Sequence, residues 1–281
     1  MRTVIKLAGA LLEDDAVVRS LAHQVAALAR EGHEILVIHG GGRLFTATLK
    51  RLGIESEFVG GLRVTDEQTR DAAVMVFAGL LNKKLAAAIS AEGQPAIGIS
   101  AADAQAFRAE PMVHNEVAGS LGFVGYLTGV NLPFIESLWR EGLLPVASCL
   151  GIGSDNQMYN INADHMAAAC AEYIGAEQLI YLTDVAGVLD GDKVLAAVMC
   201  EEIDPLVQTR TVSGGMVLKL EAAKRALVSG VREVRIVGGA SPDALLLASH
   251  FEPGTTDAHT VPGTRILREP LSTAQTALSA A

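Results

Sequence analysis

Short apolar runs alternate along the chain with longer segments whose apolar residues recur every three or four positions. Continuous apolar runs are typical of strands buried on both faces, and the longer period is typical of amphipathic helices. The runs predict strands at residues 2–7, 34–39, 96–100, 143–148, 178–183 and 233–237. The periodic segments predict helices at residues 15–30, 43–52, 131–141, 163–174, 216–229 and 241–249. This alternation predicts an α/β fold, a three-layer α/β/α sandwich around a mainly parallel sheet.

Three regions need a separate interpretation. Thr65 is followed three residues later by Gln68, a capping-box pattern that predicts the start of a long helix running to Gly93. Residues 106–130 hold short β-type pieces broken by glycines, Gly119 among them, which predicts hairpins at an edge of the sheet. Residues 268–281 are rich in Ala, Ser and Thr without an apolar period, so we expect a frayed tail.

Composition sets the domain count and limits the function classes. A chain of 281 residues with 50% hydrophobic content can bury one large core. We therefore expect a single domain over residues 1–267 with two lobes, about residues 1–150 and 151–267. The net charge of −10 argues against nucleic-acid binding, which needs clustered basic residues. We expect neither a membrane-spanning run nor a signal peptide, since the first strand is interrupted at Lys6.

The cysteines indicate the compartment. Cys149, Cys170 and Cys200 stand in apolar or small-residue stretches without CxxC spacing. This pattern favours reduced thiols in a cytoplasmic protein over a disulfide or a zinc site. We expect no dedicated metal site.

Polar clusters rich in glycine or asparagine follow several of the predicted strands. They are Lys6-Leu7-Ala8-Gly9, His39-Gly40-Gly41-Gly42, Asn160-Ile161-Asn162-Ala163-Asp164 and, further on, Gly214-Gly215-Met216-Val217-Leu218-Lys219. Glycine between a strand and a helix lets backbone N–H groups approach an anion, and lysines neutralise phosphate oxygens. Because the carboxyl ends of parallel strands meet at one edge of a sheet, the clusters predict a phosphate-handling site there.

Each of these residues also has a purely structural interpretation. Lys6 and Arg63 could simply be solvated, and the Lys219 stem could cover apolar surface. A neutral His39 satisfied by a backbone partner is favoured over a proton shuttle. Asn162 could cap the helix that starts at residue 163, which would place Asp164 in its first turn for the helix dipole alone.

Taken in order, the motifs resemble the amino acid kinase family over residues 2–267. The resemblance rests on the four clusters above and on Gly61-Leu62-Arg63-Val64-Thr65, Asn82-Lys83, Leu182-Thr183-Asp184-Val185-Ala186-Gly187-Val188-Leu189-Asp190 and Gly263-Thr264. It is strongest to the members that phosphorylate N-acetyl-L-glutamate in arginine biosynthesis. The resemblance implies the carbamate kinase-like fold of that family, with ATP and Mg²⁺ as co-substrate and the metal held mainly by phosphates and water.

The same resemblance implies roles for individual residues. Lys6 and Lys219 would stabilise the transferring phosphoryl group, and Asp164 would orient both lysines. Gly41, Gly42, Arg63 and Asn160 would bind the acylated amino acid. The adenine nucleotide would contact Gly9, Asp184, Val185, Ala186, Gly187, Val188, Leu189, Thr211, Val212 and Ser213. A side-chain carboxylate is already ionised at neutral pH, so the reaction needs no general base.

The chain departs from the family pattern in ways that leave alternatives open. Ala8 stands where a second glycine is common, and its methyl group could crowd the phosphates if the position needs a positive φ. Gly238-Gly239-Ala240 stands where arginine-inhibited members often have Asp-Gly-Arg, and the chain begins at the first strand, so we expect a homodimer without arginine feedback. The alternatives are a kinase for a carrier-linked aminoadipate or glutamate, or a non-catalytic sensor. A dinucleotide-binding module is disfavoured because no GxGxxG follows a strand.

Overall fold

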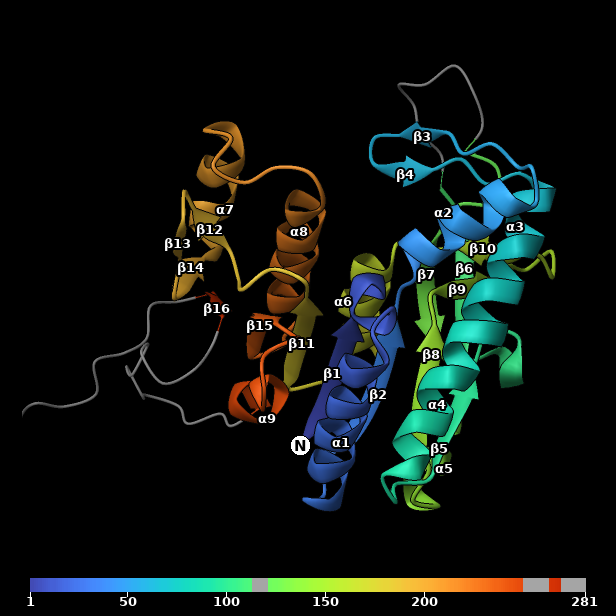
Figure 1. The fold of residues 1–281 in the computed structure, drawn as a ribbon, viewed down its shortest axis with the longest axis horizontal. Coiled ribbons are helices and arrows are strands. Elements are labelled where there is room, and N and C mark those ends of the chain that lie inside the picture. The colour runs from blue at the N-terminus through green and yellow to red at the C-terminus, as the bar shows by residue number, and fades with distance from the viewer. Residues whose placement is uncertain (113–120, 250–262, 269–281) are drawn as a thin grey trace, which may run out of the picture.

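The computed structural model describes residues 1–112, 121–249 and 263–268. Its centre is an eight-stranded sheet in the order β14-β16-β15-β11-β1-β2-β8-β5 (Figure 1). The strands are β1 (Arg2–Leu7), β2 (Glu34–His39), β5 (Ala96–Ile99), β8 (Leu144–Ser148), β11 (Gln178–Thr183), β14 (Ala197–Met199), β15 (Glu233–Gly238) and β16 (Thr264–Leu267). Neighbouring strands are parallel except for the antiparallel pair β15 and β16.

Helices cover both faces of this sheet. The α-helices of the described residues are α1 (Asp15–Arg30), α2 (Gly42–Arg51), α3 (Glu67–Ala73), α4 (Asn82–Ala91), α5 (Leu132–Arg140), α6 (Ala163–Tyr173), α7 (Cys200–Gln208), α8 (Gly215–Val228) and α9 (Ala244–Ser249). Helices α1, α4 and α9 pack together on one face, whereas α6 and α8 pack together on the other (Figure 1). The predicted three-layer α/β/α sandwich is therefore confirmed.

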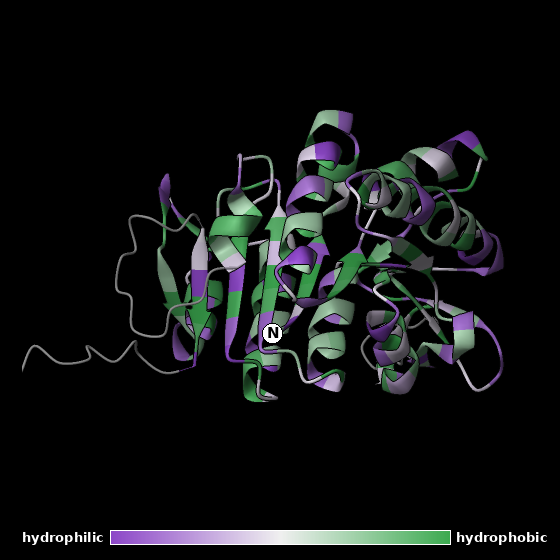
Figure 2. Cartoon of the chain, turned by 90° about the horizontal axis from the view of Figure 1, so that it is seen from below, coloured by the Kyte–Doolittle hydropathy of each residue, from purple (hydrophilic) through white to green (hydrophobic). Residues whose placement is uncertain are grey.

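The central strands form the core because they are apolar on both faces. Every residue of β11 is buried, and so is every residue of β1 after Arg2. Figure 2 shows hydrophobic segments along the central strands, between helices in which hydrophobic and hydrophilic stretches alternate. This two-sided burial is the reason that the strands appear in the sequence as continuous apolar runs rather than as alternating patterns.

A second, four-stranded sheet corrects one prediction. It consists of β10 (Met158–Asn160), β9 (Leu150–Ile152), β6 (Phe107–Pro111) and β7 (Gly125–Val130), in that order. The expected antiparallel pairing within residues 106–130 is present between β6 and β7. The expected position was wrong, because β6 also pairs with β9, and neither β6 nor β7 joins a described strand of the main sheet. Gly119 and residues 269–281 of the predicted tail lie outside the described residues.

The long helix begins differently from the prediction. Asp66, not Thr65, caps α3, because its carboxylate accepts a hydrogen bond from the Thr69 amide at 2.8 Å. The Thr65 hydroxyl group instead donates to the Arg63 carbonyl at 2.9 Å and accepts from the Asn160 side-chain amide at 3.3 Å. Between α3 and α4 the chain forms the π-helical segment η2 (Val74–Leu81), which the sequence did not predict.

The continuous helix Glu67–Ala91 also bears on the membrane question. By length and composition alone, it is the one helix in the described part of the chain that could cross a bilayer. However, 50% of its apolar window is buried inside the structure, and core helices of soluble proteins pass the same test. The helix is therefore weak evidence for a span, and the predicted absence of membrane-spanning segments stays a prediction.

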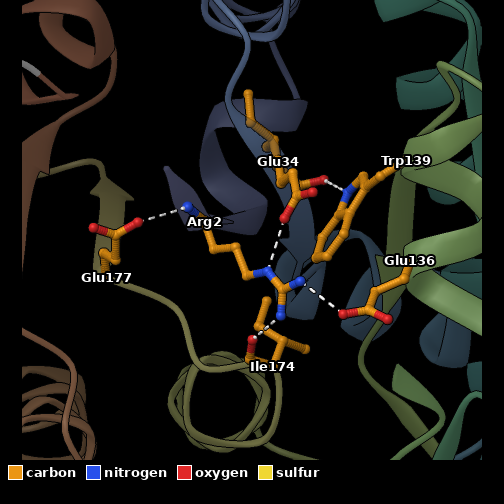
Figure 3. A network of polar contacts seen from close by, with 7 residues as sticks. Arg2, Glu34, Glu136, Trp139, Ile174 and Glu177 are labelled. Atoms are coloured by element: carbon orange, nitrogen blue, oxygen red, sulfur yellow. Dashed lines mark hydrogen bonds and ion pairs between the residues drawn. The ribbon is translucent and has the colours of Figure 1, made fainter. Parts of the chain in front are cut away.

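Arg2 links the amino-terminal end of β1 to neighbouring elements through hydrogen bonds and ion pairs (Figure 3). The Arg2 guanidinium pairs with Glu34 and with Glu136, each at 2.7 Å, and donates to the Ile174 carbonyl at 3.0 Å. These partners belong to β2, to α5 and to the end of α6. The network therefore joins β2, α5 and α6 to β1 at the end opposite to Lys6.

Candidate active site

A buried ionic cluster lies at the carboxyl end of β1. The Lys6 Nζ atom is 2.6 Å from Asp164 Oδ1, and the Lys219 Nζ atom is 2.8 Å from Asp164 Oδ2. Lys6 is the next-to-last residue of β1, Asp164 lies in the first turn of α6, and Lys219 lies near the start of α8. The structure thus brings together the two lysines and the acid that the sequence predicted as one unit.

Burial and charge set the protonation of this cluster. The side chains of both lysines are 7% exposed and that of Asp164 is 12% exposed. Burial raises the pKa of Asp164, but the charges of Lys6 and Lys219 outweigh this effect and lower it to about 2. Burial and the charge of Lys6 lower the pKa of Lys219 to about 8, against the opposing effect of Asp164. At neutral pH the cluster carries a net positive charge in a dry environment, which attracts an anion.

Local sequence explains how Asp164 is held. Asn162 caps α6, and its side-chain oxygen accepts hydrogen bonds from the amides of Asp164 at 3.0 Å and His165 at 3.2 Å. Tyr181 of β11 donates its hydroxyl hydrogen to the Asp164 carbonyl at 3.1 Å, and its ring lies 5.0 Å from Lys219 Nζ. The cap confirms the structural interpretation of Asn162, while Asp164 does more than complement the helix dipole.

A cavity of about 240 Å³ opens beside this cluster. Its lining includes every residue that was predicted to bind the acylated amino acid, together with Gly9, Lys6 and Asp164. The described lining residues are Lys6, Gly9, Gly40, Gly41, Gly42, Phe45, Phe58, Gly61, Leu62, Arg63, Phe77, Val124, Cys149, Asn160, Ile161, Asn162, Ala163 and Asp164. Lys219 contacts Asp164 but does not belong to this lining.

The glycines at the cavity differ in the space that a side chain would have at each position. A Cβ atom on Gly9 would lie 2.6 Å from the Gly41 Cα atom, so the two loops touch. A Cβ atom on Gly41 would lie 2.2 Å from a methyl group of Leu81. A Cβ atom on Gly42 would meet no described atom within 4 Å. Ala8 has φ −67°, so the concern that this position needs a positive φ does not hold.

Arg63 lies in the cavity wall with its guanidinium held on several sides. Its side chain donates to the hydroxyl groups of Ser56 and, at 2.6 Å, of Thr46. The rings of Phe45 and Phe58 lie 4.9 Å and 4.4 Å from its Cζ atom. Arg63 is 9% exposed, and burial lowers its pKa. The structure therefore contradicts the interpretation of Arg63 as a solvated loop residue.

His39 lies next to the site but is enclosed in protein. Its Nδ1 atom is 3.0 Å from the Gly40 carbonyl oxygen, and its Nε2 atom is 3.2 Å from the Asn82 amide nitrogen. Full burial lowers the pKa of His39 to about 4. His39 is therefore neutral at physiological pH and does not appear in the cavity lining, as the structural interpretation predicted.

The predicted nucleotide residues, apart from Gly9, lie outside the cavity lining. Asp184 to Leu189 follow β11, the strand directly beside β1, and Thr211 to Ser213 precede α8. Asp184 pairs at 3.1 Å with Arg43 in α2, the helix that follows the glycine loop of residues 40–42. This contact places the turn at the same edge of the sheet as the lysine cluster. Their contact with a nucleotide stays a prediction.

Sequence reasoning missed the apolar part of the cavity wall. Phe45, Phe58, Phe77 and Val124 line the cavity, as does Cys149, whose thiol pKa burial raises to about 12. An aromatic residue at helical spacing is usually a core residue, so the sequence carried no signal for Phe45 or Phe77. Cys149 was predicted as a reduced thiol in an apolar or small-residue stretch, which fits its buried environment, but its place at the cavity was not anticipated.

Known proteins match this chain over most of its length. A family model described as the amino acid kinase family matches residues 1–238. The acetylglutamate kinase of Koribacter versatilis (strain Ellin345) is 48% identical over 248 residues, which cover 87% of this chain and 93% of that protein.

Two solved structures share the fold. N-acetylglutamate synthase from Neisseria gonorrhoeae, complexed with coenzyme A and N-acetyl-glutamate, superposes with a TM-score of 0.81 at 23% identity and covers 95% of this chain. This chain spans 59% of that longer one. Carbamate kinase from Giardia lamblia bound to AMP-PNP superposes with a TM-score of 0.66 at 15% identity, over 95% of this chain and 98% of that chain. With the match of the family model, these findings show that the chain belongs to the amino acid kinase family.

Proposed function

We propose that this chain transfers the γ-phosphoryl group of ATP to the side-chain carboxylate of N-acetyl-L-glutamate, a step of arginine biosynthesis. The products are N-acetyl-L-glutamyl 5-phosphate and ADP. The observation that carries the proposal is the pair of buried lysines joined by Asp164 beside a cavity that also contains Arg63 and Asn160. The 48% identity to an acetylglutamate kinase supports the choice of substrate.

The chemistry requires positioning rather than acid or base catalysis. The acceptor carboxylate is ionised at neutral pH, since a glutamate side chain has a reference pKa near ~4.3. One of its oxygens attacks the γ-phosphorus, the bond from that phosphorus to the bridging oxygen of ADP breaks, and no proton moves. A neutral, enclosed His39 is compatible with this reaction because no base is needed.

The basic residues and backbone amides would neutralise the charge that spreads over the transferring phosphoryl group. Lys6 and Lys219 would contact its oxygens from two elements, and Asp164 would keep both ammonium groups in place. The amides of Gly41 and Gly42, at the amino end of α2, would donate to substrate and phosphoryl oxygens. Preorganised donors in a dry site are the largest catalytic contribution in reactions of this type.

The acylated amino acid would occupy the cavity. Arg63 offers a planar guanidinium that matches a carboxylate, and Asn160 offers an amide whose nitrogen also donates to Thr65 at 3.3 Å. The neighbouring rings and aliphatic side chains would surround the apolar parts of the substrate.

Mg²⁺ would enter with the nucleotide. Asp164 is the one carboxylate among the described cavity residues, and both of its oxygens are paired with lysines, so it is a poor metal ligand here. The metal would therefore be bound by the phosphates and by water. When bound, it would supply further neutralisation of the triphosphate charge.

We also propose that the chain acts as a homodimer. Strand β5 is one edge of the main sheet and packs against α4, and the π-helical segment η2 that leads into α4 exposes Met75 and Leu80 by 59% and 57%. A second copy would cover this apolar edge. Light scattering coupled to size exclusion would give twice the chain mass of 29.4 kDa, and a monomer or hexamer would contradict the proposal.

The test of the activity is direct. Purified protein is incubated with Mg-ATP and N-acetyl-L-glutamate, the acyl phosphate is trapped with hydroxylamine, and ADP release is followed in parallel. N-acetyl-L-aspartate, free L-glutamate and N-acetyl-L-2-aminoadipate serve as competing acceptors. Turnover that is highest with N-acetyl-L-glutamate supports the proposal. Absence of hydroxamate with N-acetyl-L-glutamate contradicts it, and preference for the aminoadipate compound would favour the related acyl-amino-acid kinases.

A further inference from the structure

We propose that Thr46 is a positioning residue for the acyl-amino-acid acceptor. Its hydroxyl group fixes the Arg63 guanidinium in the cavity wall and ties it to the glycine loop. The inference rests on the proposed function, because it needs an acceptor carboxylate that Arg63 binds.

The hydroxyl group of Thr46 forms two hydrogen bonds at once. The Arg63 Nη2 atom is 2.6 Å from Thr46 Oγ1, and Thr46 Oγ1 is 2.8 Å from the Gly42 carbonyl oxygen. A guanidinium only donates, so Thr46 must accept from Arg63. Its single hydrogen is then free to be donated to the Gly42 carbonyl, and both directions are determined. The result is a continuous link from Arg63 to the first turn of α2.

The surroundings of Arg63 make this link decisive for its orientation. Phe45 and Phe58 lie over the guanidinium at 4.9 Å and 4.4 Å from Cζ, so contacts in the plane of the group determine how it is turned. Two contacts of this kind are described, the hydroxyl groups of Ser56 and Thr46. Among the described residues, losing the Thr46 contact leaves Ser56 as the one hydroxyl that orients the group.

The position of Thr46 connects acceptor binding to the site of transfer. Gly42 begins α2, and its amide is one of the donors assigned to substrate and phosphoryl oxygens. A bidentate guanidinium and carboxylate contact tolerates little misorientation. We therefore expect Thr46 to act on acceptor affinity, while the lysines that face the phosphoryl group keep their geometry.

Helix α2 offers a matched control two residues away. The Thr48 hydroxyl donates to the Leu44 carbonyl at 2.8 Å, the same bond to the residue four positions earlier. No described contact joins Thr48 to Arg63. Thr46→Val and Thr48→Val therefore remove the same helical hydrogen bond and introduce the same side chain, but only the first removes the partner of Arg63. Thr46 is exposed, so its replacement is compatible with folding.

The experiment compares steady-state kinetics of wild type, Thr46→Val, Thr46→Ser and Thr48→Val. Thr46→Val should raise the KM for N-acetyl-L-glutamate about tenfold, the lower end of the scale of a hydrogen bond to a charged group. The KM for ATP and kcat should stay within about twofold, since the phosphoryl contacts are intact. Thr46→Ser should restore the wild-type KM, and Thr48→Val should not change it. Calorimetric titration of N-acetyl-L-glutamate should show the same order of affinities.

Three results would overturn the inference. They are an unchanged acceptor KM in Thr46→Val, an equal rise in Thr48→Val, and a failure of Thr46→Ser to restore binding. Failure of the proposed function looks different, because wild type itself would then produce no acyl phosphate from N-acetyl-L-glutamate. An active wild type with an unaltered Thr46→Val variant would refute the role of Thr46 alone.

Discussion

Replacing Asp164 by asparagine isolates the charge that joins the two lysines. The substitution nearly preserves shape, but it removes the carboxylate that lies 2.6 Å from Lys6 and 2.8 Å from Lys219. Two buried ammonium groups then face a neutral amide. Removing one member of a buried ionic network is far more disruptive than losing a surface pair, because the remaining charges stay desolvated.

The pKa of Asp164 gives the size of the effect on stability. Burial raises this pKa, yet the charges of both lysines lower it from 3.8 to about 2. Each unit corresponds to about 1.4 kcal/mol, so the ionised carboxylate stabilises the folded state by about 2–3 kcal/mol. A lowered acid pKa stabilises above the unfolded value near ~4 and loses that contribution as pH falls towards ~2. At pH 7, urea unfolding of the variant should therefore show a loss of about 2–3 kcal/mol.

The negative charge of Asp164 should also determine how the activity depends on pH. Burial and the charge of Lys6 lower the pKa of Lys219 to about 8, while Asp164 opposes them. Without Asp164 this pKa falls further, so Lys219 loses its proton at lower pH. In the wild type, kcat/KM for ATP should decline as pH rises through about 8. In Asp164→Asn the decline should move to lower pH by ~1 unit or more, with kcat at pH 7 reduced by ~100-fold.

A surface pair provides the control for this experiment. Asp204 accepts from Lys224 at 2.8 Å, a distance similar to those in the buried cluster, but the two side chains are 65% and 36% exposed. Asp204→Asn should change neither the unfolding free energy nor the pH profile measurably, because water screens such pairs. Equal behaviour of the two variants, or wild-type kcat/KM with an unmoved decline in Asp164→Asn, would refute the reasoning.

Three further predictions follow from the same geometry. Lys6→Ala and Lys219→Ala should each lower kcat by ~100-fold or more, and the KM values of the two substrates should change much less. Steady-state rates of ADP release would show both effects. Burial lowers the pKa of His39 from 6.5 to about 4, so the unfolding free energy should fall by up to about 3 kcal/mol as pH drops from ~6.5 to ~4. His39→Gln should abolish that slope in urea unfolding, and a slope that persists would contradict it. Gly42→Ala should keep or raise thermal stability yet weaken activity, whereas Gly41→Ala should lower the melting temperature because its methyl group meets Leu81.

Much of the fold could be predicted because its signals are local. Parallel strands covered on both faces appear as continuous apolar runs, and the strand 178–183 matches β11 at both ends. The helix predicted at residues 131–141 corresponds to α5, with Asn131 as its cap. The convergence of Lys6 and Asp164 could be predicted from topology, because the carboxyl end of β1 and the amino end of α6 lie at the same edge of the sheet.

Other features depend on tertiary contacts that leave no local pattern. The segment Val74–Leu81 is apolar almost throughout, so its period could not distinguish a π-helix from an α-helix. Helix α7 was missed because Pro205 and three acidic residues within Cys200–Gln208 suppress a helical signal. Thr65 and Asp66 are both residue types that are favoured at a helix N-cap, and only the structure shows that the Asp66 carboxylate accepts the amide hydrogen bond of the first turn.

The glycine cluster shows why the site could be located from sequence but not fully explained. The row of glycines was interpreted as an anion cradle, yet Gly41 is required by protein packing, since Leu81 and Phe77 of the π-helical segment occupy the space of its missing side chain. Glycine at position 41 is therefore no evidence of ligand approach by itself. Gly42 differs, because its surroundings leave room for a methyl group and its helical position favours alanine. Protein packing supplies no reason for glycine at position 42, so this residue, rather than Gly41, is the one on which we base the prediction of anion approach, and Gly42→Ala tests it.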